Sequence, residues 1–223
     1  MARKAAVACG AVTKHSLVMR GWPTEVLCVG QGLQEAPQHL VLFIPGNPGV
    51  ASYYRRTMEH LYNLLGGSHS VWTVSHAAHC VNLPSLWPGY QHVYSLEDQI
   101  QHKITFLETH IPCWHQANTP YECCIDATKE LLNARVVQNM LWMAKDELDK
   151  VVDLDVDVVR RYRDKLVLYY GASDAWCPVQ YWEGVRERVP EVEAVLCEDG
   201  TQHAFVLRHA EPVAEKLAHW MGS

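Results

Sequence analysis

The chain has 223 residues, of which 48% are hydrophobic and 20% are charged, and its formal net charge at pH 7 is −6. This composition is too apolar for a disordered protein, and the length suits one compact domain. Because its net charge is negative, the chain lacks the positive electrostatic field that attracts the phosphate groups of nucleic acids, so we expect no nucleic-acid partner. No apolar run approaches the roughly 20 residues of a membrane-spanning helix, so we expect no transmembrane helix.

Short apolar runs alternate with helical patterns, which predicts an α/β fold with a mostly parallel sheet and helices on both faces. We expect residues 1–23 to be disordered and the first strand to lie at 25–29. Residues 39–44 are apolar on both faces, as a central parallel strand requires. A helix over 52–65 and a strand over 71–74 should follow.

The next helix begins at Ser95, which forms a capping pair with Asp98, and ends before Pro112. Its apolar residues form one stripe: Leu96, Ile100, Ile104 and Leu107. Residues 113–164 break the alternation, because they contain a polar and aromatic segment and two helical stretches but no strand candidate. The alternation then resumes with a strand at 166–170, a helix at 179–189, a strand at 194–197 and a helix at 212–221.

The loop at 45–49 directly follows the expected central strand and precedes a helix. Ligands bind beyond the carboxyl ends of parallel strands, and backbone N–H groups there can stabilise an oxyanion. Pro48 has no N–H group, so the donor would be Asn47 or a neighbouring glycine. The alternative is a tight turn that needs glycine for its backbone angles.

Asp174 and His203 follow the last two expected strands and are 29 residues apart. A capping aspartate and a surface histidine would explain either residue alone. Together they have the acid-then-histidine order of the α/β-hydrolases, in which the acid orients the histidine that acts as base. We therefore interpret them as an acid–base pair.

Five blocks resemble lipid droplet-associated hydrolases, a branch of the α/β-hydrolase fold. They are LFIPGNPG at 42–49, VWTVSHAAH at 71–79, QIQHKITFLETH at 99–110, YYGASDAWCP at 169–178 and HAF at 203–205. Ala78 stands where the resemblance leads us to expect glycine.

The resemblance implies a serine esterase without a cofactor. Its substrates would be neutral lipid or sterol carboxylic esters, at lipid droplets and the endoplasmic reticulum. Asp174 and His203 would be the catalytic acid and base, and Asn47 would lie in the oxyanion loop. The whole chain, 1–223, would form a single α/β-hydrolase-like domain, in which 113–164 is an atypical replacement for the nucleophile and cap region.

The nucleophile is the large departure, because no Gly-x-Ser-x-Gly motif occurs in the sequence. We therefore assign no nucleophile, and we expect the nucleophile strand, the following strand and the cap to be missing. Without them, the strands at 39–44 and 166–170 lose the neighbours that would join them. This pattern indicates an alternatively spliced or incompletely predicted product of a hydrolase gene, and the chain would be cytosolic if a targeting segment is lost.

Three functions remain open. The chain is an active esterase with an unrecognised nucleophile, for which Ser52 is the least unsuitable candidate, or a non-catalytic droplet-binding or partner-binding isoform, or a nonfunctional fragment. The last two are favoured, because an acid and a base without a nucleophile leave only oxyanion and binding catalysis.

Two sets of histidines and cysteines have side chains of metal-ligand type: His76, His79 and Cys80, and His110, Cys113 and His115. The first set suits packing at a strand end, and the second lacks a fourth ligand. We assign no metal.

Overall fold

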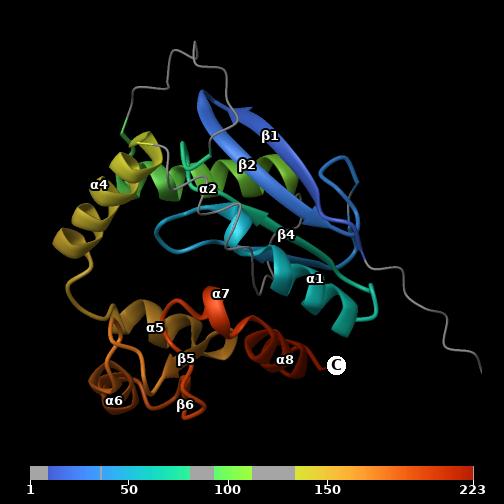
Figure 1. Ribbon diagram of the computed structural model, residues 1–223. Helices are drawn as coiled ribbons and strands as arrows, with labels where there is room; N and C mark the ends of the chain where they lie inside the picture. Colours follow the sequence, from blue (N-terminus) through green and yellow to red (C-terminus); the bar gives the residue numbers. More distant parts are fainter. Residues whose placement is uncertain (1–9, 36, 81–92, 112–133, 223) are drawn as a thin grey trace, which may run out of the picture. The chain divides into compact units, whose positions relative to one another are not determined.

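The computed structural model describes residues 10–35, 37–80, 93–111 and 134–222 (Figure 1). The chain divides into two compact units. The first unit comprises Met1–Glu147 together with Ala210–Ser223, and the second comprises Leu148–His209. Within the described ranges, no helix has the length and apolar character needed to cross a membrane. The single domain expected for 1–223 stays a prediction.

The first unit contains a mixed four-stranded sheet in the order β1-β2-β4-β3. Its strands are β1 (Thr13–Met19), β2 (Trp22–Val29), β3 (Leu40–Phe43) and β4 (Ser70–Val74). The β1–β2 and β2–β4 pairs are antiparallel, whereas β3 and β4 are parallel. The three strands predicted in this region are confirmed as β2, β3 and β4.

Strand β1 is a correction to the sequence analysis, which expected disorder throughout 1–23. Met19 lies opposite Trp22, so β1 and β2 form a hairpin with a two-residue turn. The turn residues Arg20 and Gly21 have φ angles of 49° and 87°. Two consecutive positive φ values define the turn whose twist matches that of antiparallel strands. An Arg-Gly pair is a weak signal for that turn, which is why the hairpin was missed.

Helices cover both faces of this sheet (Figure 1). On one face, Val41 and Val71 pack with α1 (Arg55–Leu64) and α8 (Ala210–Trp220). On the other face, Trp72 packs with Phe106 of α2 (Leu96–His110). Successive residues of β4 thus enter opposite cores, which confirms the prediction of helices on both faces.

Within the part of the chain that the structure describes, the first unit also contains the short η1 (Ala51–Tyr53), which precedes α1, and most of α4 (Ala134–Lys150). The predicted capping pair is present, because Ser95 Oγ accepts from the Asp98 amide at 3.2 Å and Asp98 Oδ2 accepts from the Ser95 amide at 2.9 Å. This reciprocal pair fixes the start of α2.

The second unit is a small α/β layer. Its elements are α5 (Val156–Tyr162), η2 (Arg163–Lys165), β5 (Val167–Gly171), α6 (Val179–Arg188), β6 (Glu193–Cys197) and α7 (Phe205–Arg208). Strands β5 and β6 are parallel and form a separate two-stranded sheet. Val185 of α6 and Val189, which directly follows this helix, are buried against side chains of α5 and both strands.

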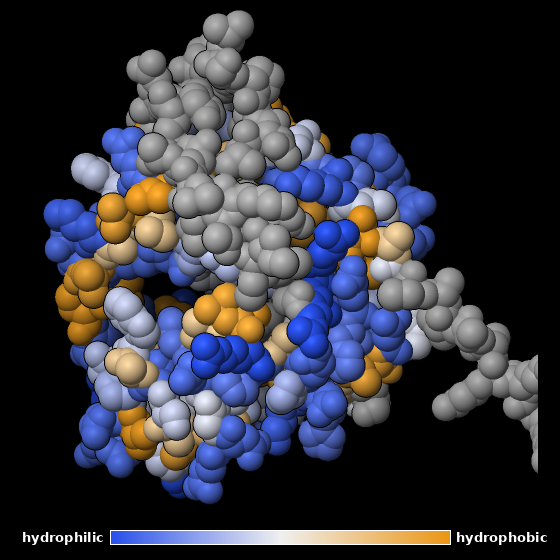
Figure 2. All heavy atoms as spheres, viewed as in Figure 1, coloured by the Kyte–Doolittle hydropathy of each residue, from blue (hydrophilic) through white to orange (hydrophobic). Residues whose placement is uncertain are grey.

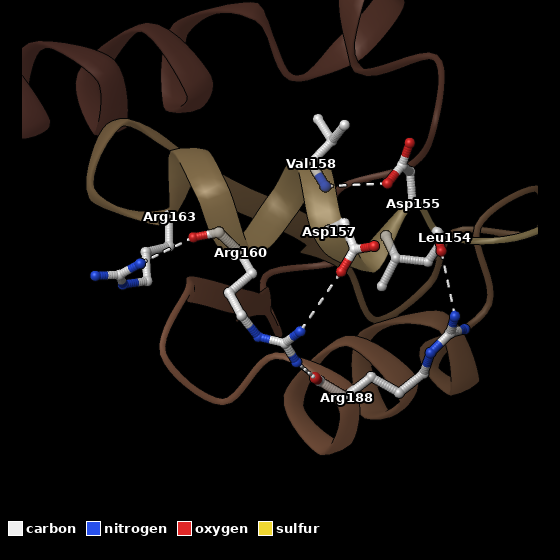
Figure 3. Close-up of polar contacts among 7 residues, drawn as sticks. All are labelled: Leu154, Asp155, Asp157, Val158, Arg160, Arg163 and Arg188. Atoms are coloured by element: carbon white, nitrogen blue, oxygen red, sulfur yellow. Dashed lines mark hydrogen bonds and ion pairs between the residues drawn. The ribbon is translucent and has the colours of Figure 1, made fainter.

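Polar contacts join α5 and α6 (Figure 3). Asp155 caps α5 by accepting from the Val158 amide at 3.0 Å. Arg188, the last residue of α6, makes two contacts with the α5 region. Its Nη2 donates to the Leu154 carbonyl at 3.2 Å, and its own carbonyl accepts from Arg160 Nη2 at 2.9 Å. These bonds orient the two helices that carry the core of the second unit.

Strands β3 and β5 each lie at the edge of a sheet. Within the described ranges, β3 pairs only with β4, and β5 pairs only with β6. The lack of a nucleophile motif predicts that these two strands lose the neighbours that would join them. The absence of the strand that would join them stays a prediction.

Candidate functional site

Asp174 and His203 are hydrogen-bonded in the second unit. His203 Nδ1 lies 3.0 Å from Asp174 Oδ2. The carboxylate side chain is 9% exposed and the imidazole is 54% exposed, so the acid is enclosed while the base faces solvent. An imidazole that is oriented through Nδ1 keeps Nε2 available for proton transfer. Asp174 and His203, which were paired in the sequence analysis because of their order in the chain, are therefore in direct contact.

The pair is positioned by the loops after β5 and β6. The Ala172 amide donates to the Cys197 carbonyl at 2.8 Å, which ties the end of β5 to the end of β6. The Asp174 amide then donates to the Gly171 carbonyl at 3.1 Å and closes the turn. Gly171 is required here, because a Cβ at this position would overlap the carbonyl oxygen of Thr201.

The second carboxylate oxygen of Asp174 is also held. Asp174 Oδ1 accepts from the amides of Trp176 at 2.8 Å and Cys177 at 3.0 Å. Burial by itself would raise the pKa of Asp174, but the amides of Cys177 and Trp176 and the contact with His203 outweigh it and lower this pKa. Asp174 is therefore ionised at neutral pH and can orient His203.

Two neighbours border the pair. The exposed Trp176 ring lies with its centroid 6.3 Å from that of His203. Cys177 is partly buried, and burial together with the charge of Asp174 raises the pKa of its thiol. Cys177 has no role in the sequence analysis, since a single cysteine in a turn carries no motif.

Asn47 lies in the loop after β3, in the first unit. Its Nδ2 donates to the Met140 carbonyl of α4 at 2.9 Å. The Gly46 amide donates to Tyr54 Oη at 3.1 Å, and the Gly49 amide donates to the Gly46 carbonyl at 2.7 Å. Because both glycine amides are engaged, the N–H of Asn47 is the donor that fits an oxyanion role. That role stays a prediction.

The alternative explanation of this loop also has structural support. Gly49 has a φ of 72°, and a Cβ there would overlap the His76 and His79 rings. The loop thus needs glycine both for its backbone angles and for its close approach to two buried histidines.

Among the described residues, one group of metal-ligand type is close enough to share an ion, namely Asp174, Cys177 and His203. His76, His79 and Cys80 are buried at the end of β4, as packing at a strand end would place them. In the second set considered, Cys113 and His115 lie outside the described residues.

The helix-flanked sheets and the acid–histidine pair after successive strands are features of an α/β hydrolase. Solved structures of that class share the fold. A serine hydrolase involved in carbazole degradation has a TM-score of 0.62 and 10% identity, covering 95% of this chain and 99% of its own. A serine hydrolase from Cycloclasticus zankles has a TM-score of 0.62 and 11% identity, covering 95% and 98%.

The sequence identifies the family more closely. The model of the lipid-droplet associated hydrolase family matches residues 37–125 and 113–206. The chain therefore belongs to the lipid-droplet associated hydrolases. It is 26% identical to the lipid droplet-associated hydrolase of Rattus norvegicus, over 96% of this chain and 93% of the relative. It is 24% identical to that of Homo sapiens, over 82% and 84%.

The alignment with the rat relative is longer than this chain. It spans 306 positions, which exceeds the 223 residues of the chain by 83. At least that many aligned positions of the relative therefore have no counterpart here. The two stretches matched by the family model share residues 113–125, which is the region where the resemblance in the sequence breaks off.

Proposed function

We propose that this chain is a lipid-droplet-associated member of the hydrolase family that has kept the acid–base pair but lost efficient ester hydrolysis. One observation carries the proposal. Asp174 and His203 are hydrogen-bonded at 3.0 Å, yet the sequence offers no Gly-x-Ser-x-Gly motif to supply the serine that they would activate. The pair can move a proton, but it has no assigned nucleophile to take one from.

The missing nucleophile region is supported by the alignment and by the sheets. The rat relative continues through at least 83 aligned positions that this chain lacks. In addition, β3 and β5 are each paired on one side only within the described ranges. A strand and helix carrying the elbow would account for both observations. The loss of this strand and helix would remove the nucleophile and so impair ester hydrolysis by this chain.

Ser52 is a poor substitute for the elbow serine. It is buried in η1, and its Oγ donates to Glu25 Oε1 at 3.2 Å. A nucleophilic serine must expose its hydroxyl to the substrate beside the histidine. Ser52 instead uses its hydroxyl for a contact inside the first unit.

A lipid surface would meet exposed apolar side chains. Leu141 and Trp142 of α4 are 60% and 52% exposed, and they line a shallow apolar depression with Val137, Gln138 and Lys145. Figure 2 shows hydrophobic side chains gathered over α4. Trp is well suited to an interface because its large ring is apolar and its N–H is polar. We propose that this face contacts the droplet surface. The lipids that the chain would meet there are neutral lipid or sterol esters.

The catalytic half of the proposal is tested by fluorophosphonate labelling of the purified full chain, with thermal unfolding of the same sample. We expect a cooperative transition and no labelled serine. Hydrolysis of a short-chain nitrophenyl ester should not exceed that of the His203→Gln variant. Labelling that disappears in Ser52→Ala or His203→Gln would show an active esterase and overturn the proposal, and so would the absence of any cooperative transition.

The droplet half is tested by flotation with triacylglycerol emulsions coated with phosphatidylcholine. We expect the chain to float with the emulsion and the Leu141→Ser/Trp142→Ser variant to stay in the aqueous fraction. The matched control is Ile100→Ser/Ile104→Ser, which removes two exposed apolar side chains from α2. If both double variants float like the unmodified chain, α4 is not the contact surface.

A further inference from the structure

Three side chains of metal-ligand type converge at the loops that follow β5 and β6. One ligand atom each from Asp174, Cys177 and His203 lies within 4.8 Å of the other two. Asp174 and Cys177 come from one turn, and His203 comes from the loop after the next strand. All three belong to the second unit.

The carboxylate of this group is already oriented. The amides of Trp176 and Cys177 hold Asp174 Oδ1 at 2.8 and 3.0 Å, which leaves Oδ2 directed at His203. Proteins usually orient a side chain that binds a metal through hydrogen bonds to the atom of that side chain that does not bind the metal. The turn therefore supplies an outer shell as well as a ligand.

The geometry points to a zinc-binding site formed by Asp174, Cys177 and His203. Ligand atoms around tetrahedral zinc lie about 3.5 Å apart, given bonds of about 2.0 to 2.3 Å. Asp174 Oδ2 and His203 Nδ1, which are 3.0 Å apart, must separate slightly, and the Cys177 sulfur lies within 4.8 Å of both ligand atoms. Rotation of the half-exposed His203 side chain can make this adjustment. That exposure also leaves room for a water molecule as the fourth ligand and for entry of the ion.

The donor set selects among metals. A thiolate and an imidazole favour zinc and similar borderline ions, whereas magnesium and calcium require mostly oxygen ligands. The thiol of Cys177 loses its proton to solvent when its sulfur bonds to the ion. One thiolate and one carboxylate then balance the two positive charges of zinc.

Zinc would compete with the acid–base pair. The ion bonds to the side chains of Asp174 and His203 that otherwise bond to each other at 3.0 Å. In the metal-bound form His203 is a ligand and cannot accept a proton from a substrate or nucleophile through that nitrogen. This inference does not depend on the proposed function, because metal binding is measured without ester hydrolysis.

The experiment is zinc titration of the metal-stripped full chain against a chromophoric chelator, repeated with cobalt(II) for spectroscopy. The variants are Cys177→Ser and His203→Gln. The matched control is Cys197→Ser, because Cys197 lies in the same unit, at the end of β6, but outside the group. Thermal unfolding of each metal-free variant verifies that it is folded.

We expect the unmodified chain and Cys197→Ser to bind zinc equally and to show a thiolate-to-cobalt charge-transfer band. Cys177→Ser should lose the band. Both ligand variants should bind at least about 100-fold more weakly, since loss of an outer-shell partner alone costs about 10 to 100-fold. Zinc should also raise the unfolding midpoint of the unmodified chain but not that of Cys177→Ser.

Two results would overturn the site. One is zinc affinity that is unchanged in both Cys177→Ser and His203→Gln, which would assign binding to other cysteines of the chain. The other is an unmodified chain that binds no zinc in the titration.

Discussion

Gly171 at the end of β5 lies so close to Thr201 that a Cβ on Gly171 would overlap the Thr201 carbonyl oxygen. This contact brings together the two loops that carry Asp174 and His203. Gly171→Ala should therefore push the loops apart and destabilise the chain by about 1 to 3 kcal/mol, as overpacking does. Urea unfolding measures the loss.

Gly184 provides the matched control for Gly171. It lies within α6, and a Cβ there would meet no atom within 4 Å. Gly184→Ala should stabilise the chain by about 0.5 to 1 kcal/mol, because alanine has the higher helix propensity. If both substitutions have the same sign, close contact at Gly171 does not set the geometry of the loops.

Ala78 has a φ of 61°, in the left-handed region that disfavours an L side chain. Such a conformation costs alanine about 1 to 2 kcal/mol, and glycine adopts it freely. After the greater chain entropy of glycine is subtracted, Ala78→Gly should raise the free energy of unfolding by about 0.5 to 1 kcal/mol.

The neighbouring Ala77 is the control for Ala78. Ala77 is buried, and its N–H donates to Gln99 Oε1 at 2.7 Å. Its φ is not positive, so its backbone does not carry the strain found at Ala78. Ala77→Gly should destabilise the chain by about 1 kcal/mol. A stabilising Ala77→Gly would show that the effect at Ala78 is unrelated to its backbone angle.

Local signals predicted much of this fold. Apolar runs located β2 to β6, and the Asp174 and His203 loops were located because each follows a strand. The loop residues came together because parallel strands end at the same edge of a sheet. The hairpin of β1 escaped prediction, since its turn has an unusual Arg-Gly pair and its residues alternate only weakly in polarity.

Helix α2 shows what periodicity could not predict. Two residues of its apolar stripe, Ile100 and Ile104, are exposed, whereas His102 and Lys103 are buried. Lys103 Nζ lies 2.8 Å from His102 Nδ1, and His102 Nε2 lies 2.7 Å from Thr24 Oγ1. These bonds satisfy the polar side chains inside the unit, and hydrogen-bond partners from distant parts of the chain leave no local pattern.

The capping pair of α2 predicts a measurable contribution to stability. Ser95→Ala removes the acceptor of the Asp98 amide, so it should destabilise the chain by about 1 kcal/mol. Ser95→Asn, which keeps a capping oxygen, should change stability much less. Equal losses in the two variants, measured by urea unfolding, would contradict a capping role.

Three buried histidines of the first unit predict loss of stability in acid. Burial, with the charge of Lys103, lowers the pKa of His79 to about 3, and the pKa of His76 is lowered well below its usual value for the same first reason. Burial, Lys103 and His79 together lower the pKa of His102 to about 2. The folded state thus binds fewer protons than the unfolded chain below about pH 6.5.

The contribution of these three histidines to stability is therefore complete above about pH 6.5, and it falls as the pH drops below this value, by up to about 1.4 kcal/mol per pH unit for each histidine. His79 is the best site for a test, because neither ring nitrogen has a hydrogen-bond partner within the described residues. His79→Leu removes a group that the unfolded chain would protonate, without leaving another polar atom unpaired.

Urea unfolding at about pH 7.5 and about pH 5 measures this linkage. Since about pH 5 lies roughly 1.5 units below the unfolded pKa, His79→Leu should reduce the difference between the two stabilities by about 2 kcal/mol. His219→Leu is the control, because His219 is exposed on α8 and should leave the difference unchanged. If His79→Leu keeps the full acid sensitivity, protonation of His79 does not contribute to it.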